Sequence, residues 1–258
     1  MVKADNPAGR LYQILDMAKG KEPNKLCRVV WAELFGISSD DVFNLFYYLR
    51  QIQQLSQASK ELLNQIDGLN IELYMQGFPL IDQILFSTNL DRSWEIWKNI
   101  LTSGVALTNL AYCSDAISMK FGEKLIEVEE LNTLISEIES LRMSIISGNF
   151  DPELTELIIE LLIAIRKAIK EYQFRGAYGI RDAVAKCFGT WFINVHRFDK
   201  EATNSQEKAS ILKNIWEFLV RVNVMIALAL NLPKLALPIY ETVALPIYQK
   251  VIALLPNN

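Results

Sequence analysis

The chain has 258 residues, of which 51% are hydrophobic and 22% are charged, and its net charge at pH 7 is −4. This length is sufficient for one large buried core or two small ones, so no disulfide or metal is needed to stabilise it. Three widely separated cysteines and a single histidine argue against a disulfide framework and a zinc site, and the acidic balance disfavours broad nucleic-acid binding.

Capping residues and the spacing of apolar residues predict helices through the first part of the chain. The Asn6-Pro7 pair is typical of a helix start, because it places a capping side chain before a proline in the first turn. Ser38 or Ser39 is expected to cap a long helix, and Trp94 and Trp97 are expected to anchor a core. The predicted elements are helices over 7–19, 26–34 and 40–66, short helical turns between 69 and 90, and a helix that opens at 91–93.

The second half of the chain shows the same helical periodicity. Apolar residues between 123 and 147 recur every three or four positions, which predicts a helix with one packed face. Asp151-Pro152 is the strongest predicted helix start, and the helix that follows carries a wide apolar stripe. Further helices are expected over 180–188 and 190–198, followed by a polar loop over 199–207. No strand pattern is found, so the predicted class is all-α, a multi-helix bundle of antiparallel helices with an apolar, proline-kinked C-terminal segment.

The C-terminal sequence is unusually apolar. Between Val222 and Pro256 the only charged residues are Lys234, Glu241 and Lys250. This segment could pack on the bundle, contact a partner or a second copy, or insert into a membrane, although its apolar runs are shorter than the ~20 residues of a membrane span. The predicted organisation is a helical bundle over 1–215, either undivided or split into two subdomains near 120, and apolar C-terminal helices over 216–258 packed on the bundle or on a partner.

Two short Leu-Pro-Ile-Tyr repeats supply the candidate contact residues of this segment. Their tyrosines suit a membrane interface, whereas each proline would leave a backbone carbonyl without a hydrogen bond in lipid. The residues expected to contact a partner or a membrane are Leu237, Pro238, Ile239, Tyr240, Leu245, Pro246, Ile247 and Tyr248.

The sequence contains no local motif for catalysis or cofactor binding. It has no phosphate-binding loop, no dinucleotide-binding fingerprint, no zinc-protease motif and no nucleophile elbow, so no catalytic residue, cofactor or metal ligand is predicted. His196 and Asp199 could form an acid–base pair, but a surface histidine is the favoured interpretation. The acidic residues Glu153, Glu156 and Glu160 are interpreted as a solvated helix face, and Cys27, Cys113 and Cys187 as small core residues.

One basic cluster is a candidate contact for an anion or a nucleic acid. Aromatic residues lie among its members, as they do in grooves that bind single-stranded nucleic acid. Interspersed acids, Glu171 and Asp182, weaken its field and favour an ordinary helix surface with paired charges. The candidate residues are Arg166, Lys167, Lys170, Arg175 and Arg181.

Three stretches carry a resemblance to a known family. They are Asn6-Pro7-Ala8-Gly9-Arg10-Leu11, Val30-Trp31-Ala32-Glu33-Leu34-Phe35-Gly36, and the block 151–183, which contains Glu171-Tyr172-Gln173-Phe174-Arg175-Gly176-Ala177. Over about the first 220 residues the chain resembles a family of uncharacterised bacterial all-helical proteins. No activity is established for that family, so the resemblance implies an all-helical fold and no catalytic residue.

Three classes of function follow. The leading hypothesis is a non-enzymatic bacterial protein that works by protein–protein contact or self-association through its apolar C-terminal segment. The alternative is a membrane-active effector, for example in prokaryotic antiviral defence. The third is an enzyme or nucleic-acid binder with a dispersed site. A polar N-terminus without a signal-peptide core favours the cytoplasm, or a peripheral position at the inner membrane face.

Overall fold

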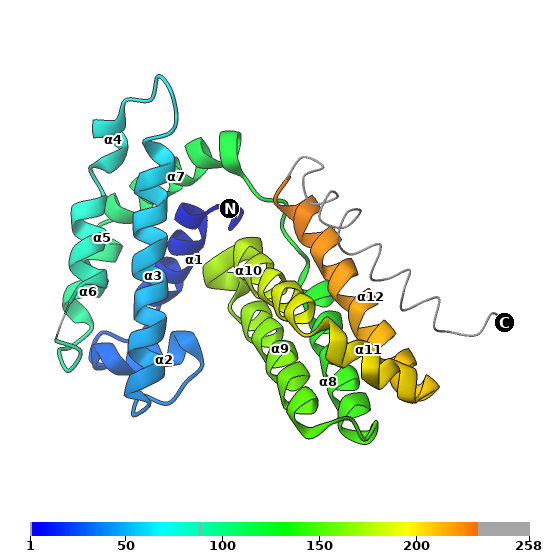
Figure 1. The fold of residues 1–258 in the computed structure, drawn as a ribbon. Helices are drawn as coiled ribbons and strands as arrows, with labels where there is room; N and C mark the ends of the chain where they lie inside the picture. Colours follow the sequence, from blue (N-terminus) through cyan, green and yellow to red (C-terminus); the bar gives the residue numbers. More distant parts are fainter. Residues whose placement is uncertain (1, 88, 232–258) are drawn as a thin grey trace. The chain divides into compact units, whose positions relative to one another are not determined.

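The computed structural model describes residues 2–87 and 89–231, and this part of the chain is all-helical, with no β-strand (Figure 1). It divides into two compact units. Unit 1 comprises Met1–Glu123 and Gln173–Gly176, and unit 2 comprises Lys124–Tyr172 and the chain from Ala177 onward. If the bundle is divided, the sequence predicts the division near 120, and the first segment of unit 1 ends at Glu123. The eight predicted contact residues between 237 and 248 lie outside the described residues.

Unit 1 is built around its first helix. This helix buries Ala8, Leu11, Ile14, Leu15 and Ala18 and packs against α2, α3, α6 and α7. The unit contains α1 (Pro7–Lys19), α2 (Cys27–Phe35), α3 (Val42–Leu63), α4 (Ile71–Met75), α5 (Phe78–Leu85), α6 (Glu95–Thr102) and α7 (Val105–Phe121).

The Asn-Pro-Ala-Gly-Arg-Leu stretch forms a buried polar joint between α1 and α7. The Asn6 side chain is fully buried and accepts a hydrogen bond from the backbone N–H of Gly9 at 3.0 Å, which caps α1 as predicted. Its amide nitrogen donates to Ser114 and to the hydroxyl of Ser118, at 3.1 Å and 2.8 Å. A Cβ on Gly9 would lie 1.8 Å from the carbonyl oxygen of Lys3, so this position requires glycine. The stretch therefore has a structural role.

Arg10 and Glu123 form a buried ion pair in unit 1. The Nη2 atom of Arg10 lies 3.0 Å from Oε1 of Glu123, and each side chain is only 4% exposed. Nη1 of Arg10 also donates to the carbonyl oxygen of Ala4 at 3.2 Å. Gly176 packs directly against the pair: a Cβ at this position would lie 2.4 Å from Nη1 of Arg10. The ion pair thus connects the start of α1 to residues that are distant in the sequence.

Aromatic side chains fill the other end of unit 1. Trp94 and Trp97 are buried, which confirms them as core anchors. Trp94 meets Trp31 edge to face with ring centroids 5.3 Å apart, and its indole N–H donates to the carbonyl oxygen of Ala18 at 3.1 Å. Phe174 lies 5.7 Å from the ring of Phe35, which anchors the returning segment 173–176 in this core.

Unit 2 is a smaller set of helices around one apolar core. The helices α8 and α9 form an antiparallel hairpin, and α12 packs against α8 and α11 (Figure 1). Asp151 caps α9 as predicted, because its carboxylate accepts from the N–H of Leu154 at 3.1 Å. The helices are α8 (Val128–Ser147), α9 (Pro152–Lys170), α10 (Tyr172–Ile193, interrupted at Gly176), α11 (Val195–Asn204) and α12 (Gln206–Ala229).

The predicted polar loop over 199–207 is wrong, because most of it is helical. Its buried residues explain the difference: Phe198 and Ala202 are one helical turn apart and both enter the core. The ring of Phe198 stacks on Trp191 with centroids 4.0 Å apart. Glu201 is also buried, where it pairs with Lys208. Tertiary packing therefore overrides the polar composition. No break occurs at residue 216, where the C-terminal segment was expected to begin, since α12 runs through it.

Other helix predictions also need correction. The helices expected over 180–188 and 190–198 are instead α10, which continues to Ile193, and α11, which begins at Val195. The helix expected from 123 begins at Val128, because tertiary partners bind the preceding amides: Lys124 N–H donates to Ala229 and Ile126 N–H donates to the hydroxyl of Tyr172. The cap of α3 is Asp41, not Ser38 or Ser39, since its carboxylate accepts from Asn44 N–H at 3.2 Å. The helix α7 was missed in the sequence altogether.

Candidate functional site

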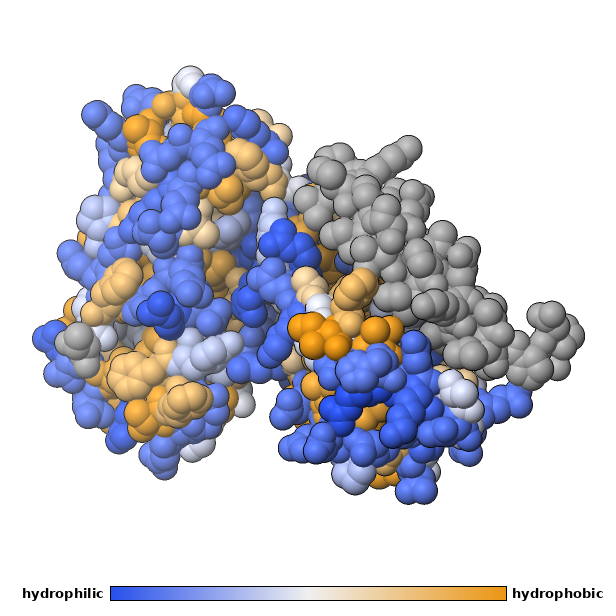
Figure 2. All heavy atoms as spheres, viewed as in Figure 1, coloured by the Kyte–Doolittle hydropathy of each residue, from blue (hydrophilic) through white to orange (hydrophobic). Residues whose placement is uncertain are grey.

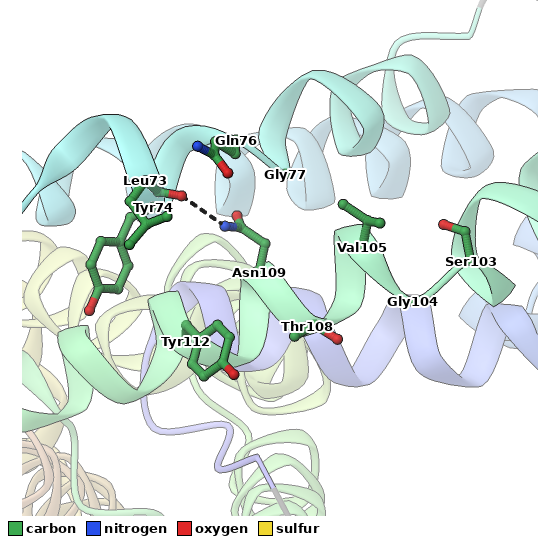
Figure 3. Close-up of a pocket in the computed structure, with 10 residues that line it drawn as sticks. All are labelled: Leu73, Tyr74, Gln76, Gly77, Ser103, Gly104, Val105, Thr108, Asn109 and Tyr112. Atoms are coloured by element: carbon green, nitrogen blue, oxygen red, sulfur yellow. Dashed lines mark hydrogen bonds between the residues drawn. The ribbon is translucent and has the colours of Figure 1, made fainter.

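A pocket of about 570 Å³ lies in unit 1 between the end of α4 and the start of α7 (Figure 3). Residues 105, 108, 109 and 112 line it from one face of α7, where the helical spacing brings them together. Leu73, Tyr74, Gln76 and Gly77 face them from α4 and the turn that follows. Ser103 and Gly104 complete the wall at the turn between α6 and α7.

Hydrogen bonds connect α7 to α4 beside this pocket. The amide nitrogen of Asn109 donates to the carbonyl oxygen of Leu73 at 3.3 Å (Figure 3). The buried thiol of Cys113 donates to the carbonyl oxygen of Tyr74 at 3.3 Å. Gly77 permits the close approach, because a Cβ there would lie 2.5 Å from Oδ1 of Asn109. Side chains of α7 thus hold α4 in place and preform the pocket.

A second hollow, which we call the groove, lies in unit 2. It has a volume of about 390 Å³ and is lined by the last turns of α12 and by the chain that enters α8. Three of its apolar residues are exposed: Leu125 at 41%, Val224 at 46% and Leu228 at 65%. Exposed apolar side chains that gather in one place mark interaction surfaces. Charged residues, Lys124, Glu130 and Arg221, also line the groove.

Figure 2 shows apolar atoms, in orange, among the hydrophilic ones on the face of each unit that it draws. Large exposed apolar side chains are also found outside the groove, for example Phe43 at 81% on α3 and Met119 at 79% on α7. Isolated exposed apolar residues are ordinary. In the groove, three of them, Leu125, Val224 and Leu228, line one hollow.

Most of the candidate anion-binding residues have acidic partners. Arg166 lies 3.1 Å from Glu139, and Lys167 lies 3.7 Å from Glu171. Arg181 pairs with Asp182 at 3.1 Å and covers the ring of Tyr178. Lys170 is exposed on α9. Of the five candidate residues, Arg175 belongs to unit 1 and the other four belong to unit 2. These ion pairs reduce the positive field, so the arrangement gives little support to binding of a polyanion.

The other chemical candidates are surface residues. His196 is exposed on α11 and makes no hydrogen bond to Asp199. The acids Glu153, Glu156 and Glu160 are exposed on α9, which confirms the solvated face. Within the described residues, no group of three His, Cys, Asp or Glu side chains is placed to hold a metal ion. Among the helices of the described part, none has both the length and the apolar character to cross a bilayer.

The three cysteines are buried, which confirms their interpretation as core residues. Burial raises the pKa of Cys113 and of Cys187 to about 12, and it also raises the pKa of Cys27. Because the thiolate is the reactive form, a thiol with that pKa has on the order of one molecule in ten thousand ionised at pH 8.

We therefore expect the folded protein to react slowly with Ellman's reagent at pH 8, and all three thiols to react at once in guanidinium chloride. Absorbance of the released thionitrobenzoate against time measures this difference. Fast reaction of one thiol in the folded protein would contradict the described burial.

Sequence reasoning did not find the pocket or the groove. The pocket depends on α7, whose face at 105, 108, 109 and 112 mixes apolar and polar residues and gave no clear stripe. Gly104 directly before Val105 was the available signal for a helix start. The groove joins the sequence near 125 to the sequence near 225, a contact that local patterns do not encode.

Comparison with protein-family models, with curated proteins and with solved structures finds no match for this chain. The resemblance to a bacterial helical family therefore stays a prediction.

Proposed function

We propose that this protein is a non-enzymatic interaction protein that self-associates, and that the groove of unit 2 receives the apolar C-terminal sequence of a second copy. The observation that carries this proposal is the position of the groove. Its last lining residue, Ala229, lies at the end of α12, immediately before the apolar sequence that begins at Leu232.

The groove and the C-terminal sequence are both rich in apolar residues. The sequence 232–258 has only three charged residues, so it needs an apolar surface to leave water. The groove offers Leu125, Val224 and Leu228, each of them at least 41% exposed. Burial of such side chains contributes roughly 25 cal/mol per Å² of apolar surface removed from water.

The end of α12 favours a change of direction. Asn231 has a φ of 49°, the left-handed conformation that commonly terminates helices, and Pro233 cannot continue one. The helix α12 therefore ends at the groove, which its last residue, Ala229, lines. Because the apolar residues of the groove are exposed, the surface is open to a second chain.

A charge placed in the groove should weaken self-association. We expect Leu228→Glu to reduce the self-association constant by about tenfold or more, since it puts a hydrated charge where the apolar segment would bind. Sedimentation velocity over a range of protein concentrations measures this. The matched control is Met143→Glu on α8, at a residue that is 60% exposed and outside the groove.

Equal self-association of both variants and the unchanged protein would contradict the role of the groove. Circular dichroism of the variants checks that the helices are retained. Because Leu228 is 65% exposed, its replacement should have little effect on folding.

Membrane insertion by the C-terminal sequence is the alternative that the same residues raise. Liposome flotation of the full chain with vesicles of phosphatidylethanolamine and phosphatidylglycerol distinguishes it from self-association. If the unchanged protein and Leu228→Glu both float with the vesicles to the same extent, membrane insertion would be favoured over self-association.

A further inference from the structure

The pocket of unit 1 has the properties of a site for a small molecule. Its volume of about 570 Å³ lies within the range of roughly 300–1,000 Å³ that is usual for ligand sites. Apolar and aromatic side chains, Leu73, Tyr74, Val105 and Tyr112, form much of its lining. The hydrogen bonds of Asn109 and Cys113 already hold its walls together, so little ordering is required when a ligand binds.

The polar groups of the pocket can recognise hydrogen-bonding atoms at the edge of a ligand. The side chains of Gln76 and Thr108 are exposed in the pocket and form no hydrogen bond within the described residues. The amide of Gln76 both donates and accepts, and so does the hydroxyl of Thr108. Ser103 donates to the carbonyl oxygen of Ile100 at 2.7 Å, which leaves its oxygen free to accept.

The pocket contains no charge partner for an ionic ligand. None of its ten lining residues is Asp, Glu, Lys, Arg or His. An adjacent hollow, which shares Gly104, Thr108 and Tyr112 with it, includes Lys19, but that ammonium already lies 2.6 Å from Asp16. A charged ligand would lose hydration against apolar walls without gaining an opposite charge.

We propose that this pocket binds a small, uncharged molecule with a planar apolar body and amide or hydroxyl groups at its edge. Tyr74 and Tyr112 contact the planar body, and Gln76 and Thr108 bond to its polar edge. This site lies in unit 1 and is independent of the groove in unit 2.

Three probes with one indole body and different charges test the proposal. They are indole-3-acetamide, which is neutral, indole-3-acetate, an anion, and tryptamine, a cation. Saturation-transfer difference NMR with the full chain measures their binding. We expect the amide to bind with a Kd of ~1 mM or below and about tenfold more tightly than either charged probe.

A variant with a blocked pocket tests whether the probe binds at this position. Val105→Trp places a large side chain in the pocket at a residue that is 54% exposed, and it should abolish the signal of the amide. Met119→Trp makes the same change on α7 outside the pocket and should preserve that signal. Circular dichroism confirms the fold of both variants.

Several outcomes would overturn the proposal. They are the absence of binding by all three probes, tighter binding of a charged probe, or an equal signal from the amide in Val105→Trp and in the unchanged protein. None of these results bears on self-association, which depends on the groove of unit 2.

Discussion

Replacement of Arg10 by alanine should destabilise unit 1 by about 3–5 kcal/mol, because it leaves the carboxylate of Glu123 buried without its arginine partner. Both side chains are 4% exposed, so water cannot easily replace the lost partner. Hydrogen exchange of peptides from α1 and α7, followed by mass spectrometry, reports the opening of this unit. We expect protection there to fall more than about a hundredfold.

A double variant separates the ion pair from simple packing. Arg10→Met combined with Glu123→Leu removes both charges. The double variant should therefore lose less stability than either Arg10→Met or Glu123→Leu alone, each of which leaves one buried charge without its partner. Lys25→Ala is the control for an ordinary pair: Lys25 lies 2.6 Å from Glu33, but their side chains are 32% and 34% exposed. Its loss should have little effect on the free energy of unfolding, because both charges stay hydrated. An Arg10→Ala variant as stable as Lys25→Ala would refute the importance of the buried pair.

Replacement of Gly176 by alanine should lower the free energy of unfolding by a similar amount, because the added methyl group meets both backbone strain and a steric clash. Gly176 has φ 57° and ψ −157°, a conformation that is essentially restricted to glycine and costs other residues on the order of 1–3 kcal/mol. The new Cβ would also lie 2.4 Å from Nη1 of Arg10 and 2.6 Å from Oε2 of Glu123. We expect a total loss of about 3 kcal/mol or more.

Gly189 in the same helix provides a matched control. Nothing lies within 4 Å of a Cβ built there, and its φ is not positive. Gly189→Ala should therefore stabilise α10 by up to about 1 kcal/mol through helix propensity alone. Urea unfolding, monitored by circular dichroism, compares the two. Equal unfolding midpoints for the two variants would contradict the account of Gly176.

The sequence predicts helices well wherever a cap and a regular stripe occur together. Asn6-Pro7 and Asp151-Pro152 mark the starts of α1 and α9, and both structural caps are the predicted side chains. Prediction fails where tertiary contacts decide the local structure. The helix α11 forms because Phe198 and Ala202 reach the core. Residues 124–127 are not helical, and the amides of Lys124 and Ile126 bond to Ala229 and Tyr172 instead.

The candidate sites were much less predictable than the fold. The pocket requires that α4 lie on α7, and the groove requires that residues near 125 lie beside residues near 225. No local pattern specifies either contact. The sequence predicts a helix start at Asn6-Pro7, but the buried polar contacts of the Asn6-to-Leu11 stretch depend on Ser114, Ser118 and Glu123, which are distant in the sequence.

The most direct test of self-association compares the full chain with a chain that ends at Asn231. Size-exclusion chromatography with light scattering gives the mass of each. We predict a dimer or larger assembly for the full chain and a folded monomer for the shortened one. A folded monomer in both forms would contradict the central claim. If the shortened monomer alone then bound a dye specific for apolar surfaces, the C-terminal sequence would instead cover the groove of its own copy.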